Sequence, residues 1–399
     1  MLELDERIAE LDALGLARAT RTIEGPQGPH VVVDGRTALL MCSNNYLGLA
    51  DHPRVRAAAA EAALHWGVGA GASRLVSGTM TVHRDLEQQL ADFKRRPAGL
   101  LFGSGYLANM GVISALAGRG QVVFSDRLNH ASIVDGCRLS RAEVFVYRHL
   151  DVEHLRWGLE RAGDRAAMIV TDSVFSMDGD VAPLPDLVEM ARRHGVRLVV
   201  DEAHATGALG TGGRGAVAAA GLSGDVDVLV GTLGKALGSY GAFVACDESM
   251  ARFLTNIART FLFSTAPPIP AVAGAAAALS VLRERPALVD SLQSGAMHLR
   301  SALSLEGFDV GAGSTQIVPV IIGDASLTMR VSELALERGV FAQAIRPPTV
   351  PNGSSRLRLT VMATHSEQEL RQAAHVIGGA ARECGVHLPS RGRDLRDAA

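Results

Sequence analysis

Lys235 is the residue whose chemistry is most distinctive in this sequence. It lies in the segment GTLGKALG (231–238), directly after a predicted strand, and Lys94 is the one other lysine among 39 Lys and Arg residues. A lysine amine can form a Schiff base with an aldehyde, whereas an arginine guanidinium cannot. The alternative is a phosphate-binding lysine of the P-loop type. That motif requires Ser or Thr after the lysine, and here Ala236 follows it.

Asp201 and His204 form a second candidate group, at the end of the predicted strand RLVVD (197–201). Acids that face a ligand commonly lie at this end of the strands in a parallel sheet. Pyridoxal phosphate acts as an electron sink only while its pyridine nitrogen is protonated, and an adjacent carboxylate favours the protonated form. Three residues further on, His204 is a candidate partner for the ring's phenolic oxygen. The alternatives are a Walker-B-type magnesium ligand for Asp201 and a structural histidine for His204.

A glycine-rich turn, GSGY (103–106), lies between a predicted strand and a predicted helix. The N–H groups at the start of a helix bind phosphate, which makes Gly105 and Tyr106 candidate phosphate contacts. A short GSG sequence is also typical of an ordinary tight turn. A second glycine-rich stretch, at 67–79, is either a flexible segment near a ligand or a loop.

Composition restricts the class of protein. The 399 residues are 47% hydrophobic and 20% charged, with a formal net charge of -3, so the chain can bury a large core and shows no basic excess for nucleic acid. The four cysteines form no CxxC pair, which argues against a zinc site and a disulfide scaffold. The N-terminal residues lack the features of a secretory signal, and the apolar stretch 271–282 is too short to cross a bilayer. We therefore expect a soluble, cytoplasmic α/β protein without metal, nucleic acid or membrane.

The elements that must position these residues alternate between helices and short apolar strands. This pattern predicts a mostly parallel sheet covered by helices on both faces. The expected strands are 99–102, 121–125, 142–147, 167–172, 197–201, 226–231 and 241–246. Outside the sheet we expect a helix over 4–19, a hairpin over 31–41 that turns at Asp34-Gly35, a long helix over 271–303, a strand over 315–323, a helix over 327–338 and a strand over 356–362.

Eight stretches, in this order, resemble the α-oxoamine synthases, a family of fold-type I pyridoxal phosphate enzymes. They are SNNYLGL (43–49), GAGASRLVSGT (69–79), FGSGYLAN (102–109), DRLNHASIVDG (126–136), FSMDGDVAPL (175–184), VDEAHATGALG (200–210), GTLGKALGSYGA (231–242) and FSTAPPIP (263–270). The run RPPTVP (346–351), followed by RLRLT (356–360), is most similar to the branch that makes 8-amino-7-oxononanoate for biotin synthesis.

The resemblance implies an α/β fold with a large domain, which contains a mostly parallel seven-stranded sheet, and a smaller α+β domain built from the chain ends. The expected parts are an N-terminal helix and hairpin segment (1–42), a large cofactor-binding domain (43–285), a small domain (286–388) and a flexible tail (389–399). The implied cofactor is pyridoxal 5'-phosphate.

The resemblance also implies a role for each matching residue. Lys235 would hold the cofactor through a Schiff base and act as acid and base at the substrate Cα, while Asp201 would pair with the pyridine nitrogen and His204 with the phenolic oxygen. His130, expected to be both catalytic and substrate-binding, would stack on the ring face opposite Lys235. The other implied cofactor contacts are Ser176 near the phenolic oxygen, Gly105, Tyr106 and Thr232 at the phosphate, and Ser264 and Thr265 at the phosphate of a neighbouring subunit. The implied substrate contacts are Asn44 and Arg358 at the amino-acid carboxylate and Arg18, Arg346 and Thr349 at the acyl group.

The implied reaction is the decarboxylative condensation of L-alanine with pimeloyl-CoA, or with pimeloyl on acyl carrier protein, by a homodimer with shared active sites. Its products would be 8-amino-7-oxononanoate, carbon dioxide and the free thiol carrier. A sister enzyme that uses glycine or serine with another acyl-CoA is the first alternative, and a non-catalytic cofactor- or nucleotide-binding protein is the second. Without the resemblance, His130 would be a capping or surface histidine, Arg358 a solvent-facing charge and Asn44 a turn residue.

Overall fold

The chain forms two compact units in the computed structural model, which describes residues 3–14 and 16–388. Unit 1 comprises Met1–Asn44, Met177–Gly179 and Ser291–Ala399, and unit 2 comprises Asn45–Ser176 and Asp180–Asp290. The expected tail at 389–399 lies outside the described residues.

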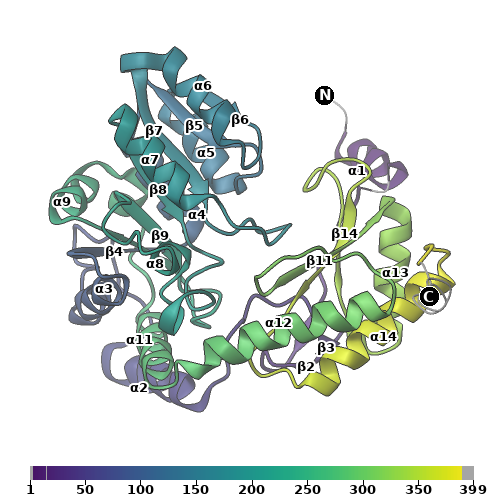
Figure 1. The fold of residues 1–399 in the computed structure, drawn as a ribbon. Helices are drawn as coiled ribbons and strands as arrows, with labels where there is room; N and C mark the ends of the chain where they lie inside the picture. Colours follow the sequence, from purple (N-terminus) through teal and green to yellow (C-terminus); the bar gives the residue numbers. More distant parts are fainter. Residues whose placement is uncertain (1–2, 15, 389–399) are drawn as a thin grey trace. The chain divides into compact units, whose positions relative to one another are not determined.

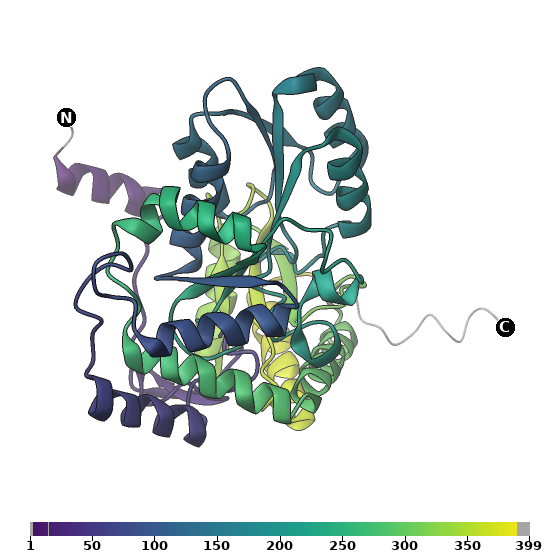
Figure 2. The same cartoon turned by 90° about the vertical axis from the view of Figure 1, so that its left-hand side faces the viewer.

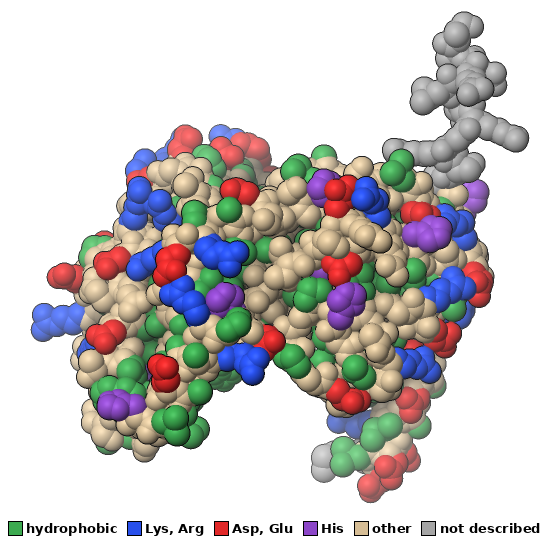
Figure 3. Space-filling model, turned by 90° about the horizontal axis from the view of Figure 1, so that it is seen from below, with side chains coloured by type: hydrophobic (Ala, Val, Ile, Leu, Met, Phe, Trp, Pro, Cys, Tyr) green, Lys and Arg blue, Asp and Glu red, His purple; other side chains and the backbone are tan. Residues whose placement is uncertain are grey.

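Over the face drawn in Figure 3, Arg and Lys side chains are interspersed with Asp and Glu side chains.

Unit 2 is built on a seven-stranded sheet with the strand order β4-β10-β9-β8-β7-β5-β6 (Figure 1). The strands are β4 (Ala98–Phe102), β5 (Val122–Asp126), β6 (Glu143–Tyr147), β7 (Ala166–Asp172), β8 (Arg197–Asp201), β9 (Val228–Thr232) and β10 (Ala242–Cys246). Strands β9, β8, β7, β5 and β6 are mutually parallel, and β10 runs antiparallel to both of its neighbours. The seven expected strands and the mostly parallel sheet are therefore confirmed.

Helices cover both faces of this sheet, which is why its strands are apolar along their whole length. On one face, α4 (Gly105–Leu116), α5 (Ala131–Ser140) and α9 (Glu248–Ile257) share a buried core with the strands. Helices α6 (Val152–Ala162) and α7 (Leu184–His194) pack against β5 to β8 on the opposite face (Figure 1). The remaining helices of this unit are α2 (Pro53–Trp66), α3 (Thr81–Lys94), α8 (Ala216–Ala219), α10 (Arg259–Leu262) and α11 (Ile269–Glu284), of which α2 and α11 lie side by side (Figures 1 and 2).

Over its described residues, unit 1 contains two small sheets and four helices. One sheet has the order β1-β2-β3-β12 and the other, fully antiparallel, the order β11-β14-β13. The strands are β1 (Ile23–Glu24), β2 (His30–Val33), β3 (Arg36–Leu40), β11 (Ile317–Gly323), β12 (Val340–Phe341), β13 (Gln343–Ile345) and β14 (Ser355–Thr360). The helices are α1 (Leu4–Ala13), α12 (Ala287–Leu305), which begins in unit 2, α13 (Ala325–Glu337) and α14 (Glu367–Glu383). The predicted hairpin is confirmed, with Asp34 and Gly35 at positive φ in its turn.

Two helix predictions were wrong in their extent. The single helix expected over 271–303 is two helices, α11 and α12, because Pro286 has no N–H to donate and disfavours helical geometry at Arg285, whose φ and ψ are -129° and 63°. The N-terminal helix expected over 4–19 ends at Ala13. Beyond that end, the carbonyl of Ala17 accepts a hydrogen bond from the Arg346 guanidinium. Within 3–14 and 16–388, no helix combines the length and hydrophobicity needed to cross a bilayer.

Candidate active site

A cavity of about 200 Å³ in unit 2 collects side chains from the carboxyl ends of the parallel strands. Asp172 ends β7, Asp201 ends β8 and Thr232 ends β9, while Lys235 lies in the turn that follows β9. The lining residues are Gly105, Tyr106, His130, Ser132, Asp172, Asp201, Ala203, His204, Thr232 and Lys235. Seven of these ten were proposed from the sequence, so the fold brings together residues that lie up to 130 positions apart, from Gly105 to Lys235.

The Lys235 amine is hydrogen-bonded within this cavity. Its Nζ lies 2.9 Å from Nε2 of His204, and Nδ1 of the same ring lies 2.7 Å from the hydroxyl of Tyr46. Tyr46 is fully buried and His204 is nearly so. Because both nitrogens of the imidazole have a partner, Tyr46 holds the ring in the orientation that faces Lys235.

Asp201 is held by neutral donors. Its Oδ2 accepts a hydrogen bond from Nδ2 of Asn109 at 2.6 Å, and its Oδ1 accepts one from the backbone N–H of Ala203 at 2.7 Å. The Asn109 amide also donates to the Ser132 hydroxyl at 2.9 Å, and that hydroxyl lies 2.8 Å from Nδ1 of His130. The chain of contacts fixes the carboxylate and the imidazole in one network.

The surroundings of the His130 imidazole favour its neutral form. Burial lowers its pKa, and the positive charge of Lys235 lowers it further, while the negative charge of Asp201 acts in the opposite direction. An uncharged, flat ring in this position is suited to stacking on an aromatic ligand. Tyr106, at the start of α4, meets the same ring edge to face, with 6.4 Å between the ring centroids.

Asp172 is a member of the cavity that the sequence analysis missed. Burial and the adjacent Asp201 carboxylate raise its pKa well above the ordinary value. Its Oδ2 accepts a hydrogen bond from the backbone N–H of His130 at 2.7 Å. Its position was readable in principle, because Asp172 ends an apolar strand just as Asp201 does and the two are register partners. Tyr46 and Asn109 were missed as well, although both lie inside stretches that resemble the family.

The N-terminus of α4 borders this cavity. Ser104 is the N-cap residue, and its hydroxyl accepts a hydrogen bond from the N–H of Leu107 at 3.2 Å. The N–H groups of Gly105 and Tyr106 therefore stand at the open first turn of the helix, next to the cavity. A Cβ added to Gly105 would meet no atom within 4 Å, which leaves room for a ligand.

Three proposed cofactor contacts of unit 2 do not line this cavity. Ser176 follows buried Phe175 in the loop between β7 and α7. Ser264 and Thr265 lie after α10, where Thr265 forms an isolated β-bridge with Ser73 and is exposed. For Ser264 and Thr265, a position outside the cavity of their own chain is consistent with a contact to a neighbouring subunit. That role, like the contact expected for Ser176, stays a prediction.

Five of the six proposed substrate contacts belong to unit 1, and the sixth, His130, lines the cavity of unit 2. Both terminal nitrogens of Arg358 donate to Oδ1 of Asn44 at 3.2 Å, and Arg358 is buried rather than solvent-facing. Arg18 donates to the Thr349 hydroxyl at 3.3 Å. Arg18, Thr349 and Arg346 line a separate cavity of about 500 Å³.

Comparisons with known proteins agree with the family resemblance found in the sequence. The aminotransferase class I and II family model matches residues 36–377. Proteins named 8-amino-7-oxononanoate synthase from Geobacter sulfurreducens and Geobacter metallireducens are each 51% identical, over 95% and 96% of this chain and 98% of their own length. A solved structure of serine palmitoyltransferase with pyridoxal phosphate has a TM-score of 0.91 at 33% identity, over 96% of this chain and 98% of the other. For 8-amino-7-oxononanoate synthase from Francisella tularensis the TM-score is 0.75 at 25% identity, over 87% and 98%.

Proposed function

This chain belongs to the 8-amino-7-oxononanoate synthase family of pyridoxal phosphate-dependent enzymes, and we propose that it condenses L-alanine with a pimeloyl thioester. The products are 8-amino-7-oxononanoate, carbon dioxide and the free thiol of CoA or of acyl carrier protein. The observation that carries the proposal is the cavity of unit 2, where the Lys235 amine, the His204 imidazole and the Asp201 carboxylate line one space.

The residues of this cavity match the chemical groups of the cofactor. When bound, pyridoxal phosphate supplies an electron sink for the negative charge that develops at the substrate Cα. Lys235 would hold its aldehyde, Asp201 its pyridine nitrogen and His204 its phenolic oxygen, and the neutral His130 ring would cover one face. The first turn of α4 and the Thr232 hydroxyl would hold the phosphate.

The side chains of the cavity have separate roles in proton transfer and in orienting one another. Lys235 moves the proton at the substrate Cα, and the 2.9 Å contact from Nζ to His204 sets the direction of its amine. Tyr46 fixes the His204 ring from behind. Asn109 and the N–H of Ala203 hold the Asp201 carboxylate so that it keeps one orientation.

Substrate recognition is assigned to unit 1. The guanidinium of Arg358, already oriented by Asn44, is a bidentate donor of the kind that binds a carboxylate such as that of alanine. Arg18 and Thr349 form the acyl contact in the cavity that they line with Arg346, where an arginine can bind the free carboxylate of the pimeloyl group.

We propose a cytoplasmic homodimer in which Ser264 and Thr265 contact the cofactor phosphate of the partner. The support is an exposed apolar surface on both sides of the Ser73–Thr265 bridge. Its large side chains are 60–79% exposed, namely Val68, Leu75, Val76 and Phe263. The four cysteines are free thiols, which fits a reducing compartment.

The test is an amino-acid panel on the purified enzyme. Release of carbon dioxide is measured with alanine, glycine and serine against pimeloyl-CoA and other acyl thioesters, and the products are weighed by mass spectrometry. We expect turnover with alanine and pimeloyl-CoA to exceed every other pair by at least about tenfold. Preference for glycine or serine would assign the chain to a sister activity instead.

A further inference from the structure

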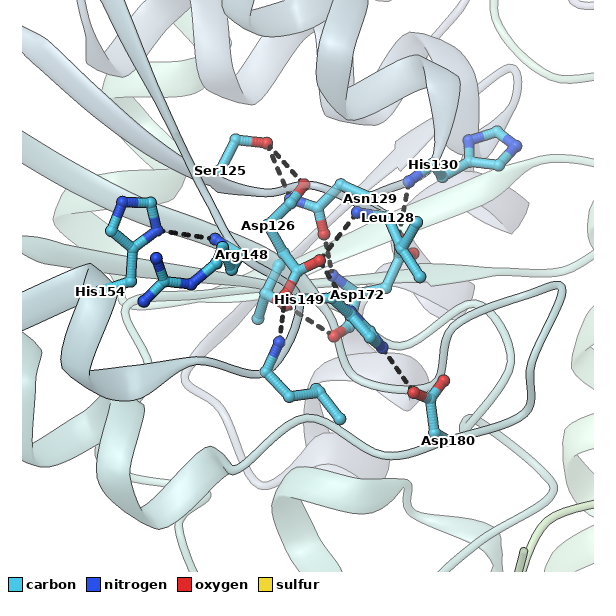
Figure 4. Close-up of polar contacts among 12 residues, drawn as sticks. Ser125, Asp126, Leu128, Asn129, His130, Arg148, His149, His154, Asp172 and Asp180 are labelled. Carbon is cyan, nitrogen blue, oxygen red and sulfur yellow. Dashed lines mark hydrogen bonds and ion pairs between the residues drawn. The ribbon is translucent and has the colours of Figure 1, made fainter. Parts of the chain in front are cut away.

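His149 lies between two carboxylates, outside the cavity described above (Figure 4). Its Nδ1 is 2.9 Å from Oδ1 of Asp126, and its Nε2 is 2.5 Å from Oδ2 of Asp180. A carboxylate accepts hydrogen bonds, so a ring with a carboxylate at each nitrogen carries a proton on both and is a cation. The ring packs edge to face on buried Phe175, with 4.5 Å between centroids.

One of these carboxylates organises the turn that leads to His130. Asp126 ends β5, and its two oxygens also accept the N–H groups of Leu128 at 2.8 Å and Leu150 at 3.0 Å. Further along the turn, the amide of Asn129 donates to the carbonyl of Val170 at 2.8 Å and accepts the N–H of Asp172 at 2.9 Å. The turn ends at His130, the N-cap of α5, whose backbone N–H donates to Asp172.

The other carboxylate belongs to the loop that carries Ser176, between β7 and α7. Asp180 is joined to Phe175 across this loop by the hydrogen bond from the Phe175 N–H to the Asp180 carbonyl, at 3.0 Å. The loop's base is attached to β8, since both the N–H and the hydroxyl of Ser173 donate to the carbonyl of Asp201 at 2.8 Å. Further along the loop, the His149 ring contacts the Asp180 carboxylate.

We propose that His149 is a positioning residue for the cofactor: its imidazolium ties the turn that ends at His130 to the loop that carries Ser176. The inference rests on the proposed function, because His130 and Ser176 matter as ring and phenolic-oxygen contacts. Strands β6, β5 and β7 are neighbours in the sheet, so one side chain at the end of β6 reaches the segments that follow both of the others.

The charges around His149 favour the imidazolium. Burial disfavours the charged ring, but the hydrogen bonds and charges of Asp126 and Asp180 outweigh it and raise the pKa of His149 to about 9. The Asp126 side chain is 1% exposed, whereas that of Asp180 is 32% exposed. Other charged or titratable groups on the adjoining elements include Glu143 and Tyr147 of β6, Arg127 after β5, Asp172 of β7, His154 of α6, and Arg148, which pairs with Asp151.

The test compares His149→Gln with the wild-type holoenzyme by two measurements other than activity. One is the dissociation constant of pyridoxal phosphate, and the other is the visible circular dichroism of the bound cofactor, which reports how the ring is held. We expect His149→Gln to bind the cofactor at least about tenfold more weakly and to lose about half of the dichroism. Asp180→Asn should act in the same direction, and the double variant should be no worse than His149→Gln alone.

His154→Gln is the matched control. This histidine lies on neighbouring α6 and accepts the N–H of Arg148 at 2.9 Å, but it contacts neither carboxylate (Figure 4). We expect wild-type cofactor affinity and dichroism for it. The inference is overturned if folded His149→Gln keeps both values within twofold of the wild type. If His149→Gln does not fold, Asp180→Asn decides by the same criterion. A wild-type protein that takes up no pyridoxal phosphate would instead refute the proposed function.

Discussion

Asp172 and Asp201 end adjacent strands, yet their surroundings give the two carboxyl groups different tasks. Asp201 receives hydrogen bonds from Asn109 and from the N–H of Ala203, so its oxygens are oriented as acceptors toward the cavity. Burial and the neighbouring Asp201 charge raise the pKa of Asp172 well above its ordinary value. Asp172 accepts the His130 N–H and so holds the turn, while we propose Asp201 as the partner of the cofactor's pyridine nitrogen.

Lys235→Ala should lower the turnover rate by at least about a thousandfold. No other described group in the cavity offers an amine that can hold the aldehyde. Borohydride reduction of the wild-type holoenzyme should fix the cofactor on the peptide that contains Lys235. Lys94 is the internal control. It is buried and ion-paired with Glu202 at 2.7 Å, so its peptide should stay unlabelled. Label on Lys94, or none on Lys235, contradicts the assignment.

The raised pKa of His149 predicts a pH-dependent contribution to stability. Its folded pKa of about 9 lies above the ordinary 6.5, so the stabilisation is complete below pH 6.5 and is lost as the pH rises through 9. A shift of this size corresponds to on the order of 3 kcal/mol. Urea unfolding of wild type and His149→Gln should therefore differ more at pH 6.5 than at pH 9.5. An equal difference at the two pH values would show that the imidazolium contributes nothing through its charge.

At the level of elements, local sequence was sufficient where a residue's own conformational preference decides the structure. The Asp34-Gly35 pair turns the chain at positive φ, and apolar runs such as those of β7 and β8 form buried parallel strands. The prediction of one long helix over 271–303 was wrong because a single residue, Pro286, interrupts an otherwise apolar helical pattern. The effect of that proline is local and was open to prediction.

Contacts between distant elements could not be read from local patterns. Tyr46 reaches His204 across 158 positions, and Asn109 reaches Asp201 across 92. The presence of Lys235 and Asp201 in one cavity was predictable from residue type and strand position. The partners that orient them depend on the strand order of the sheet, which the sequence pattern does not determine.

The N-cap of α4 offers a test at this scale. Ser104→Ala removes the hydroxyl that accepts the Leu107 N–H, at a cost of about 1 kcal/mol, and loosens the first turn where the cofactor phosphate would bind. Ser366→Ala is the matched control, because Ser366 caps α14 in unit 1 through the N–H of Glu369. Both variants should lose similar stability in urea unfolding. Cofactor affinity should fall several-fold for Ser104→Ala and stay unchanged for Ser366→Ala, and equal affinities would argue against a phosphate site on α4.

For the whole molecule, the apolar side chains around the Ser73–Thr265 bridge are the surface through which we expect two copies to associate. Phe263 is 72% exposed and lies directly before Ser264, so an interface at this surface would also carry Ser264 and Thr265 to the partner. A surface of this kind exposed to water favours association through the burial of apolar area.

Phe263→Glu should therefore convert the dimer to a monomer, because it removes a large apolar side chain from the interface and places there a carboxylate that must be desolvated. Sedimentation velocity measures the assembly, and cofactor affinity measures the contribution of Ser264 and Thr265 to the partner's phosphate site. Leu305→Glu, at a side chain 77% exposed in unit 1, is the control and should stay dimeric with full affinity. If Phe263→Glu separates the subunits without weakening cofactor binding, the dimer stands but the shared phosphate site does not. A monomeric wild-type protein would contradict both the dimer and the shared phosphate site, because Ser264 and Thr265 lie outside the cavity of their own chain.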